Sequence, residues 1–328
     1  MSQDKSIVVV AGEASGDVLG ADLIKSIKEH DPHFNISGMG GTHMQEAGAN
    51  IIVDIKNLDI MGFVEVITNL MLIRRTFKTI KQHLIDTRPD LVILIDYPGF
   101  NLRMAKVAKK YAKKVLYYVS PQLWAWHYSR IKKIKRFVDH MAVLFPFEVD
   151  IYRREGVDVT YVEHPLIAAS AEHINHSADL VNKHTVALLP GSRQSEISRL
   201  LPEMIKASDI IRGQLPNIEF VLPLAKKVDK NSLGTLPEHI RLIEDNHYDA
   251  ISQCAAAICT SGTVTLETAL LQVPHVIIYK CGAINYHIAK RLIKTNWIGL
   301  SNIVAEKCIA PELIQQEATA QRIANSRY

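Results

Sequence analysis

Short apolar runs separated by helical patterns constrain the fold of this chain more than any other feature of its sequence. The runs are rich in β-branched residues and do not alternate apolar with polar positions, so each predicts a strand covered by helices on both faces of a sheet. The predicted strands of the first half are residues 7–11, 35–39, 91–96, 115–119, 140–144 and 159–162. Those of the second half are residues 185–189, 218–222, 240–243, 255–259 and 275–279. This alternation is typical of α/β domains built on a parallel sheet.

Two domains are expected, because 328 residues exceed what one hydrophobic core usually organises. Each half opens with an apolar strand, a Gly-containing turn and a helix. The stretch 167–184 is polar and rich in histidine, and we interpret it as the connection between the domains. We therefore predict an α/β fold of two facing doubly wound Rossmann-like domains, residues 1–168 and 169–328, with a cleft between them.

Composition narrows the class of protein. Apolar residues make up 48% of the chain and charged residues 22%, as in soluble globular proteins. The best candidate for a membrane span, residues 61–73, carries Glu65 and Asn69 and is too short. The N-terminus is not a secretory signal, and the 4 cysteines show no zinc spacing and suit a reducing cytosol. The net charge of +4 reflects basic clusters whose spacing matches no base-reading module, so nucleic acid is not an expected partner.

Two loops at the ends of predicted strands of the first half carry candidate residues. Glu13 and Ser15 lie in the turn G-E-A-S-G-D, which is not a dinucleotide fingerprint. A tight turn with Ser15 or Asp17 as the helix cap explains the turn equally well, although it does not require the acidity of Glu13. Asp96 follows the strand of residues 91–95 in the loop D-Y-P-G-F-N, where a carboxylate can act as a general base or can cap the turn.

Two loops of the second half combine small residues, hydroxyl groups and a helix start. Gly191, Ser192 and Arg193 open a helix where backbone N–H groups and a guanidinium suit a diphosphate, unless Arg193 merely pairs with Glu196. The segment T-S-G-T contains Ser261, Gly262 and Thr263 and opens another helix, with Glu267 one turn further on, where a carboxylate can take both ribose hydroxyls. Helix capping is the alternative role for the hydroxyls. Two phosphate-suited helix starts in one domain indicate a nucleoside diphosphate.

Eight stretches, which extend over most of the chain and occur in family order, resemble the lipid-A-disaccharide synthase family. They are A-G-E-A-S-G-D (11–17), M-G-F-V-E-V (61–66), D-Y-P-G-F-N (96–101), Y-V-S-P-Q-L-W-A-W (118–126), F-P-F-E (145–148), L-L-P-G-S-R (188–193), T-S-G-T (260–263) and A-K-R-L-I-K-T (289–295). The resemblance implies a GT-B architecture and a cytoplasmic enzyme bound peripherally to the inner membrane. Its reaction would be the inverting transfer of 2,3-diacylglucosamine from UDP-2,3-diacylglucosamine to 2,3-diacylglucosamine 1-phosphate, which yields the lipid A disaccharide 1-phosphate and UDP.

The resemblance also implies roles for single residues. Asp96 would be the base that takes a proton from the acceptor hydroxyl, with Glu13 as a second catalytic candidate. The other implied positions are Ser15, Asn101 and Trp126 on the acceptor and sugar side, Gly191, Ser192, Arg193, Ser261, Gly262 and Thr263 at the diphosphate, Glu267 at the ribose, and Asn302 at the nucleotide end of the site. No cofactor and no obligatory metal are implied, and a homodimer is compatible with the resemblance.

Several departures from the family pattern keep alternatives open. Gly99 replaces an aspartate that many relatives have, Glu163 stands where glycine is usual, and Ser301 stands where proline is usual. The chain also ends at Tyr328, before the final helices that the resemblance implies. The alternatives are a shortened homologue that binds nucleotide or lipid without turnover, and a GT-B-like UDP-sugar epimerase.

Overall fold

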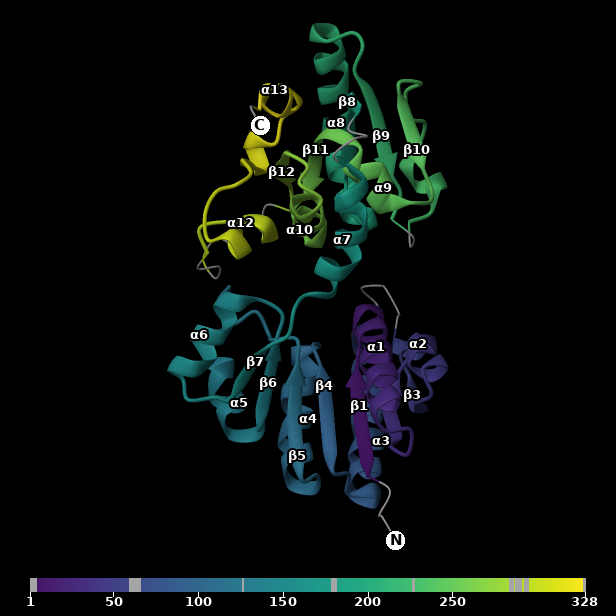
Figure 1. The fold of residues 1–328 in the computed structure, drawn as a ribbon, viewed down its shortest axis with the longest axis vertical. Coiled ribbons are helices and arrows are strands. Elements are labelled where there is room, and N and C mark those ends of the chain that lie inside the picture. The colour runs from purple at the N-terminus through teal and green to yellow at the C-terminus, as the bar shows by residue number, and fades with distance from the viewer. Residues whose placement is uncertain are drawn as a thin grey trace. The chain divides into compact units, whose positions relative to one another are not determined.

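A computed structural model of the chain describes residues 5–58, 66–125, 127–177, 182–225, 228–282, 286, 291 and 295–326. The chain divides into two compact units, Met1–Glu163 (unit 1) and His164–Tyr328 (unit 2). Each unit is an α/β body with its own sheet, and the paired strands of both sheets run parallel (Figure 1). This finding confirms the predicted α/β class with two parallel sheets.

The sheet of unit 1 has seven strands in the order β3-β2-β1-β4-β5-β6-β7. Their bounds are β1 Ser6–Ala11, β2 Asn35–Gly40, β3 Asn50–Asp54, β4 Leu91–Ile95, β5 Lys114–Tyr118, β6 His140–Val143 and β7 Val159–Tyr161. The helices are α1 Ala14–His30, α2 Thr42–Glu46, α3 Val66–Thr87, α4 Pro98–Tyr111, α5 Ile131–Phe137 and α6 Pro146–Arg154, with short 3-10 turns at Ile55–Leu58 and Tyr128–Arg130.

Both faces of this sheet are apolar, which is why its strands do not alternate. Ile7, Val9 and Ala11 of β1 pack on one face with α1 and α2, where Ile24 is fully buried. The residues between them, such as Val8, pack on the other face with apolar residues of α3, α4 and α5. Successive side chains of a strand point to opposite faces, so a strand buried on both sides must be apolar throughout.

The sheet of unit 2 has six strands in the order β10-β9-β8-β11-β12-β13. Their bounds are β8 Asn182–Leu189, β9 Glu219–Pro223, β10 Ile240–Ile243, β11 Cys254–Thr260, β12 His275–Tyr279 and β13 Glu312–Ile314. The helices are α7 Pro165–Ser177, α8 Gln194–Gln214, α9 His247–Ser252, α10 Thr263–Leu270, α12 Leu300–Ala305 and α13 Ala320–Ala324, with 3-10 turns at Lys230–Leu233 and Gln315–Glu317.

The structure differs from the sequence expectations mainly at the edges of the sheets. All eleven predicted strands are present, but β3 and β13, which are edge strands of the two sheets, were not predicted from the sequence. The stretch 167–184, interpreted as a connection, instead contributes helix α7, which packs on α9 and α10 of unit 2, and the start of β8. Neither Ser15 nor Asp17 caps α1, whose N-cap is Glu13 without a side-chain bond.

Candidate functional site

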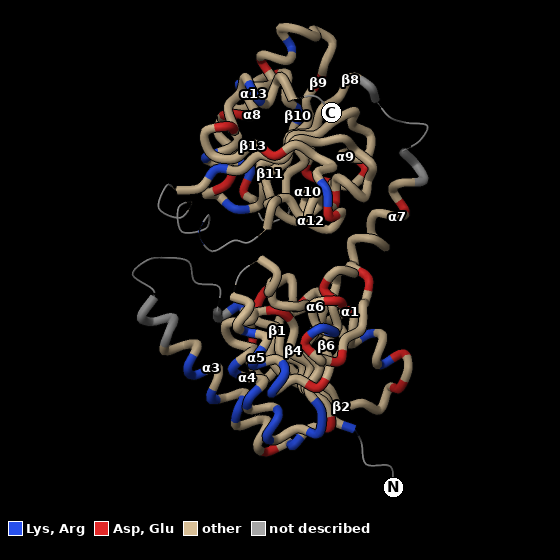
Figure 2. The backbone as a smooth tube through the Cα atoms, turned by 90° about the vertical axis from the view of Figure 1, so that its left-hand side faces the viewer, with Lys and Arg blue, Asp and Glu red and all other residues tan. Residues whose placement is uncertain are grey.

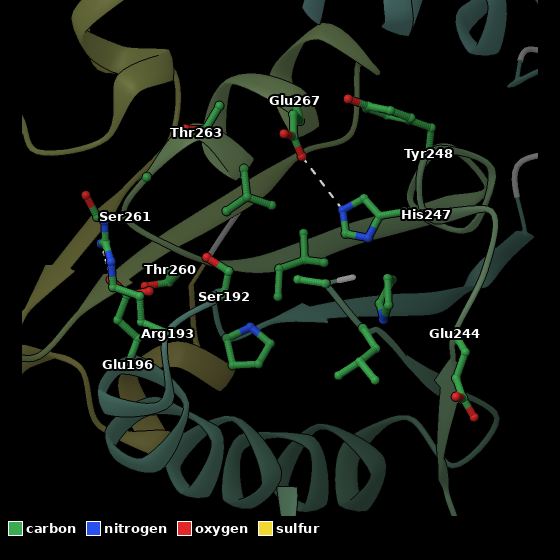
Figure 3. A pocket seen from close by; sticks show the side chains of 18 of the residues that line it. Ser192, Arg193, Glu196, Glu244, His247, Tyr248, Thr260, Ser261, Thr263 and Glu267 are labelled. Carbon is green, nitrogen blue, oxygen red and sulfur yellow. Dashed lines mark hydrogen bonds and ion pairs between the residues drawn. The ribbon is translucent and has the colours of Figure 1, made fainter. Parts of the chain in front are cut away.

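A pocket of about 990 Å³ opens in unit 2 at the carboxyl ends of β8, β9, β10 and β11 (Figure 3). Ligands of open parallel sheets bind at this edge, because loops and helix starts converge there. Seven of the eight residues predicted for the donor lie in its wall, from two loops that are far apart in the sequence. They are Gly191, Ser192, Arg193, Ser261, Gly262, Thr263 and Glu267.

The first loop joins β8 to α8 and requires its glycine. Gly191 has a φ of +105°, and a side chain there would come within 2.5 Å of the Glu196 carboxylate. Arg193 is the N-cap residue of α8, and its Nη1 donates to Glu196 Oε1 at 2.9 Å. The sequence alternative for Arg193, an ion pair with Glu196, is therefore present. The Arg193 side chain is nevertheless 78% exposed, so its remaining donors face the pocket and solvent.

The second loop joins β11 to α10, and here the hydroxyl groups are not equivalent. The Ser261 hydroxyl donates to the carbonyl of Ile298 at 2.8 Å, and the Ser261 N–H donates to Ile278. A hydroxyl has a single hydrogen to donate. In this arrangement Ser261 fixes the loop, whereas Thr263, the first residue of α10, keeps its hydroxyl free of partners among the described residues.

The far wall of the pocket was not predicted from the sequence. It consists of residues 244–248, which follow β10 and include the start of α9, and of residues 223–225, at and just after the end of β9. Their position in the sequence could have identified them. They follow β10, which was predicted correctly, and the C-terminal end of a parallel strand lies at the same edge of the sheet as those of β8 and β11. His247 and Tyr248 of this wall face Glu267 (Figure 3).

Asn302 is not brought to the pocket wall. Its side chain is fully buried and is engaged on both sides, with Nδ2 donating to Ala310 and Glu312 and Oδ1 accepting from two backbone N–H groups. Glu312 also accepts from the N–H groups of Ile298 and Gly299. These bonds brace the segment that accepts the Ser261 hydroxyl. Asn302 thus supports the wall from behind, and a contact with the nucleotide stays a prediction.

In unit 1, Asp96 lies at the end of β4 in an unusual backbone conformation. Asp96 and Tyr97 are consecutive left-handed residues, with φ of 44° and 46°. Such φ values are uncommon outside glycine and are maintained only when the surroundings determine them. Here Asn101 Nδ2 and the Tyr117 hydroxyl both donate to the Asp96 carbonyl, at 2.9 and 2.7 Å. Asn101 is therefore a buried brace of this loop.

The same surroundings change the chemistry of the Asp96 carboxyl group. Burial, and secondarily the negative charge of Glu13, raise the pKa of Asp96 to about 6, although the N–H of Tyr97 opposes this. A pKa near the working pH suits a general base, because the carboxylate is mostly ionised and still binds a proton well. The two predicted catalytic residues, Asp96 and Glu13, are thus electrostatically coupled. Ser15 is exposed in the first turn of α1.

Glycine in the turn after β1 makes room for Tyr97. A side chain at Gly12 would overlap the Tyr97 ring.

Asp17, in the same motif, reaches to the start of α2, where its carboxylate accepts hydrogen bonds from the N–H groups of Gly41, His43 and Met44. Burial alone would raise the pKa of Asp17, but these hydrogen bonds together with that of the His43 ring lower it.

The predicted aromatic residue of the acceptor side, Trp126, lies outside the described residues. Trp124, two residues before Trp126, packs edge-on against Phe147, with ring centroids 5.6 Å apart. Within the residues that the structure describes, no cluster of three or more His, Cys, Asp and Glu side chains could hold a metal ion.

The family model and the curated relatives that match this sequence carry equivalent descriptions. Residues 7–328 match the family model described as lipid-A-disaccharide synthetase. The curated lipid-A-disaccharide synthase of Coxiella burnetii (strain CbuK_Q154) is 46% identical over 333 residues, which cover 99% of this chain and 88% of that protein. The lipid-A-disaccharide synthase of Geobacter metallireducens is 44% identical over 331 residues, covering 98% and 86%.

Comparison with solved structures shows the fold. The glycosyltransferase of kitacinnamycin has a TM-score of 0.62 at 14% identity and covers 98% of this chain and 89% of its own. The UDP-GlcNAc 2-epimerase of Methanocaldococcus jannaschii has a TM-score of 0.58 at 12% identity, covering 98% and 93%. The calicheamicin glycosyltransferase CalG4 has a TM-score of 0.56 at 13% identity, covering 99% and 91%. The chain therefore has the GT-B type of fold, and identities this low carry no further conclusion.

Proposed function

The chain belongs to the lipid-A-disaccharide synthase family, and from this premise we propose that it transfers 2,3-diacylglucosamine, with inversion, from UDP-2,3-diacylglucosamine to 2,3-diacylglucosamine 1-phosphate. The products are the lipid A disaccharide 1-phosphate and UDP. The observation that carries the proposal is the pocket of unit 2, whose wall joins the loop before α8 to the loop before α10. Both loops end in helix starts of the kind that favour phosphate groups.

Arg193 and the two helix starts stabilise the departing UDP in this proposal. Negative charge grows on the diphosphate as its bond to the sugar breaks, so donors fixed at that point stabilise the transition state more than the ground state. Arg193 supplies a permanent positive charge on an exposed side chain, and Thr263 supplies a free hydroxyl. Glu267, four residues into α10, is the candidate for the ribose hydroxyls.

Asp96 activates the attacking hydroxyl of the acceptor. Its pKa of about 6 leaves the carboxylate mostly ionised in a neutral cytosol while keeping it basic enough to share a proton. The left-handed backbone of Asp96 and Tyr97, and the hydrogen bonds that Asn101 and Tyr117 donate to the Asp96 carbonyl, hold the Asp96 side chain at the C-terminal end of β4. Glu13 keeps the Asp96 carboxylate basic through its negative charge, and with Ser15 it lines the acceptor side.

A peripheral site on the inner membrane suits lipid substrates, and cations on the helices of unit 1 support it. No helix in the described part of the chain is both long enough and apolar enough to cross a bilayer. Arg74, Arg75, Lys78 and Lys81 are exposed on α3. Residues 97–138 contain Lys and Arg but no Asp or Glu. They include α4, which packs against α3, and α5, which packs against α4 (Figure 2). Such a surface suits acidic phospholipid head groups.

Incubation of the purified chain with both lipid substrates tests the proposal. We expect UDP and the disaccharide 1-phosphate to form in equal amounts, and we expect Asp96→Ala to abolish both while it still binds UDP. Binding of UDP without any product would instead favour a homologue that does not turn over. Consumption of a water-soluble UDP-sugar in the absence of the acceptor would favour an epimerase.

A further inference from the structure

Glu267 is surrounded by aromatic and imidazole rings that neither loop of the diphosphate site provides. Its side chain is 18% exposed, and its Oε2 lies 3.7 Å from Nε2 of His247 (Figure 3). Burial, and secondarily the Glu267 charge, raise the pKa of Tyr248 to about 12. Burial lowers the pKa of His164, which the Glu267 charge opposes. The carboxylate therefore acts electrostatically on two of these rings and lies at ion-pair distance from the nitrogen of the third, His247.

The His247 ring is held in place by packing from two helices. His247 is the first residue of α9, and its ring meets that of Tyr248 edge-on, with centroids 6.0 Å apart at 85°. Tyr248 in turn stacks on His173 of α7 at 5.3 Å. A hydrogen bond of 2.6 Å between His173 Nδ1 and Asp249 Oδ1 fixes the His173 ring. The orientation of His247 is thus set by contacts that do not involve a ligand.

The two nitrogens of His247 have different surroundings. Nε2 faces the Glu267 carboxylate, whereas Nδ1 is buried and has no hydrogen-bond partner in the part of the chain that the structure describes. At 3.7 Å the contact is longer than a hydrogen bond, so Nε2 restrains the rotation of the carboxylate by electrostatic attraction, and the oxygen that faces Nε2 leaves the other oxygen for a ligand. A restrained carboxylate loses less freedom on binding than a free one.

We infer that His247 is a positioning residue, which acts through Glu267 to fix the carboxylate for the vicinal hydroxyls of the ribose. The inference rests on the proposed function, because it assumes that a uridine diphosphate occupies the pocket. His247 itself does not contact the reacting atoms in this role. This role makes His247 a determinant of specificity for ribose over deoxyribose.

Binding of UDP and of 2′-deoxy-UDP, measured by calorimetry, separates this role from simple packing. In the unsubstituted chain we expect the 2′-deoxy compound to bind about 10- to 100-fold more weakly, as for the loss of a hydrogen bond to a charged group. Glu267→Ala should remove this preference. His247→Ala should reduce it to about threefold or less and should weaken UDP binding about tenfold.

Two amide variants provide the matched controls. The Gln amide nitrogen can take the place of Nε2, so His247→Gln should keep most of the ribose preference. The Asn amide takes the place of Nδ1 and does not reach Glu267, so His247→Asn should behave like His247→Ala. If the role passes through Glu267, the double variant of His247→Ala and Glu267→Ala binds UDP no more weakly than Glu267→Ala alone.

Failure of the inference and failure of the proposed function give different results. If the unsubstituted chain binds neither nucleotide, the proposed function fails. If UDP binds and His247→Ala keeps the full ribose preference with a normal melting temperature, His247 is not a positioning residue. Equal weakening of both nucleotides in all His247 variants, with a lowered melting temperature, would assign His247 to packing of α9 and would also overturn the inference.

Discussion

The pocket of unit 2 and the Asp96 loop of unit 1 each lie at the C-terminal ends of the strands of their own sheet, but they are built from different kinds of groups. In unit 2 the candidate binding groups are helix starts and an exposed arginine that is already paired with Glu196. In unit 1 the candidate base is a half-buried carboxylate on left-handed backbone, and the negative charge of Glu13 acts on it. The first arrangement costs the fold little, whereas the second is unfavourable to folding.

The difference follows from what each group has to do. Binding of a diphosphate needs donors that face an accessible pocket, and backbone N–H groups at a helix start provide them without burying a charge. A carboxylate base needs a raised pKa, which burial and a nearby like charge both provide. We therefore expect that substitutions in unit 2 lower affinity, and that substitutions at Asp96 lower turnover while stabilising the fold.

Asp96→Asn should give the largest effect. Loss of a general base lowers turnover by about a thousandfold, and the decline of the rate below about pH 6, where Asp96 becomes protonated, should disappear with it. The measurement is disaccharide formation as a function of pH. Asp90→Asn, at the other end of β4, is the control that should keep both the rate and the pH profile. A full rate for Asp96→Asn would exclude Asp96 as the base.

Arg193→Ala should act on affinity instead. Loss of charge-assisted hydrogen bonds to the diphosphate weakens UDP binding by about 10- to 100-fold. Calorimetric titration with UDP measures this, and Arg212→Ala, in the last turn of the same helix, should bind normally. Unchanged affinity in Arg193→Ala would mean that the ion pair with Glu196 is the whole role of Arg193.

Asp96→Asn should also change the stability of the fold. The folded pKa of Asp96 is raised from 3.8 to about 6, so its favourable contribution to stability is present below about pH 4 and is lost as the pH rises through about 6. At neutral pH the free energy of unfolding of Asp96→Asn should exceed that of the unsubstituted chain by up to about 3 kcal/mol. Denaturant titrations at several pH values measure this, and the gap should close toward pH 4.

Asp17 provides the opposite case within unit 1. Its folded pKa is lowered, so the stability that it contributes is present above the unfolded pKa of 3.8 and is lost as the pH falls through the folded value. Asp17→Asn removes charge-assisted hydrogen bonds to the start of α2 and should cost about 2 kcal/mol at neutral pH. Denaturant titration measures the cost. A stabilised Asp17→Asn would show that burial, rather than hydrogen bonding, dominates at this carboxylate.

Much of the fold could be predicted because the central strands are apolar on both faces. The edge strand β3 could not, since Asn50–Asp54 is exposed or only half-buried and carries polar residues at both ends. Helix α7 was missed because its polar, histidine-rich sequence resembles a connection. Its His173 is nevertheless explained by the bond to Asp249, which lies 76 residues further along the chain.

The candidate site shows the same limit. The loops after β4, β8 and β11 were found because small and polar residues follow apolar runs. Which hydroxyl is free could not be predicted, since Ser261 is engaged by Ile298 through a contact 37 residues away in sequence. The left-handed backbone of Asp96 likewise depends on Tyr117 and Asn101, whose positions come from the packed sheet.

A crystal structure of the chain with UDP bound is the most direct test of the account. We expect the diphosphate at the starts of α8 and α10, with the Arg193 guanidinium turned to its oxygens, the Thr263 hydroxyl donating to it, and the ribose at Glu267. A diphosphate bound away from these two helix starts, with Arg193 still engaged only by Glu196, would contradict it.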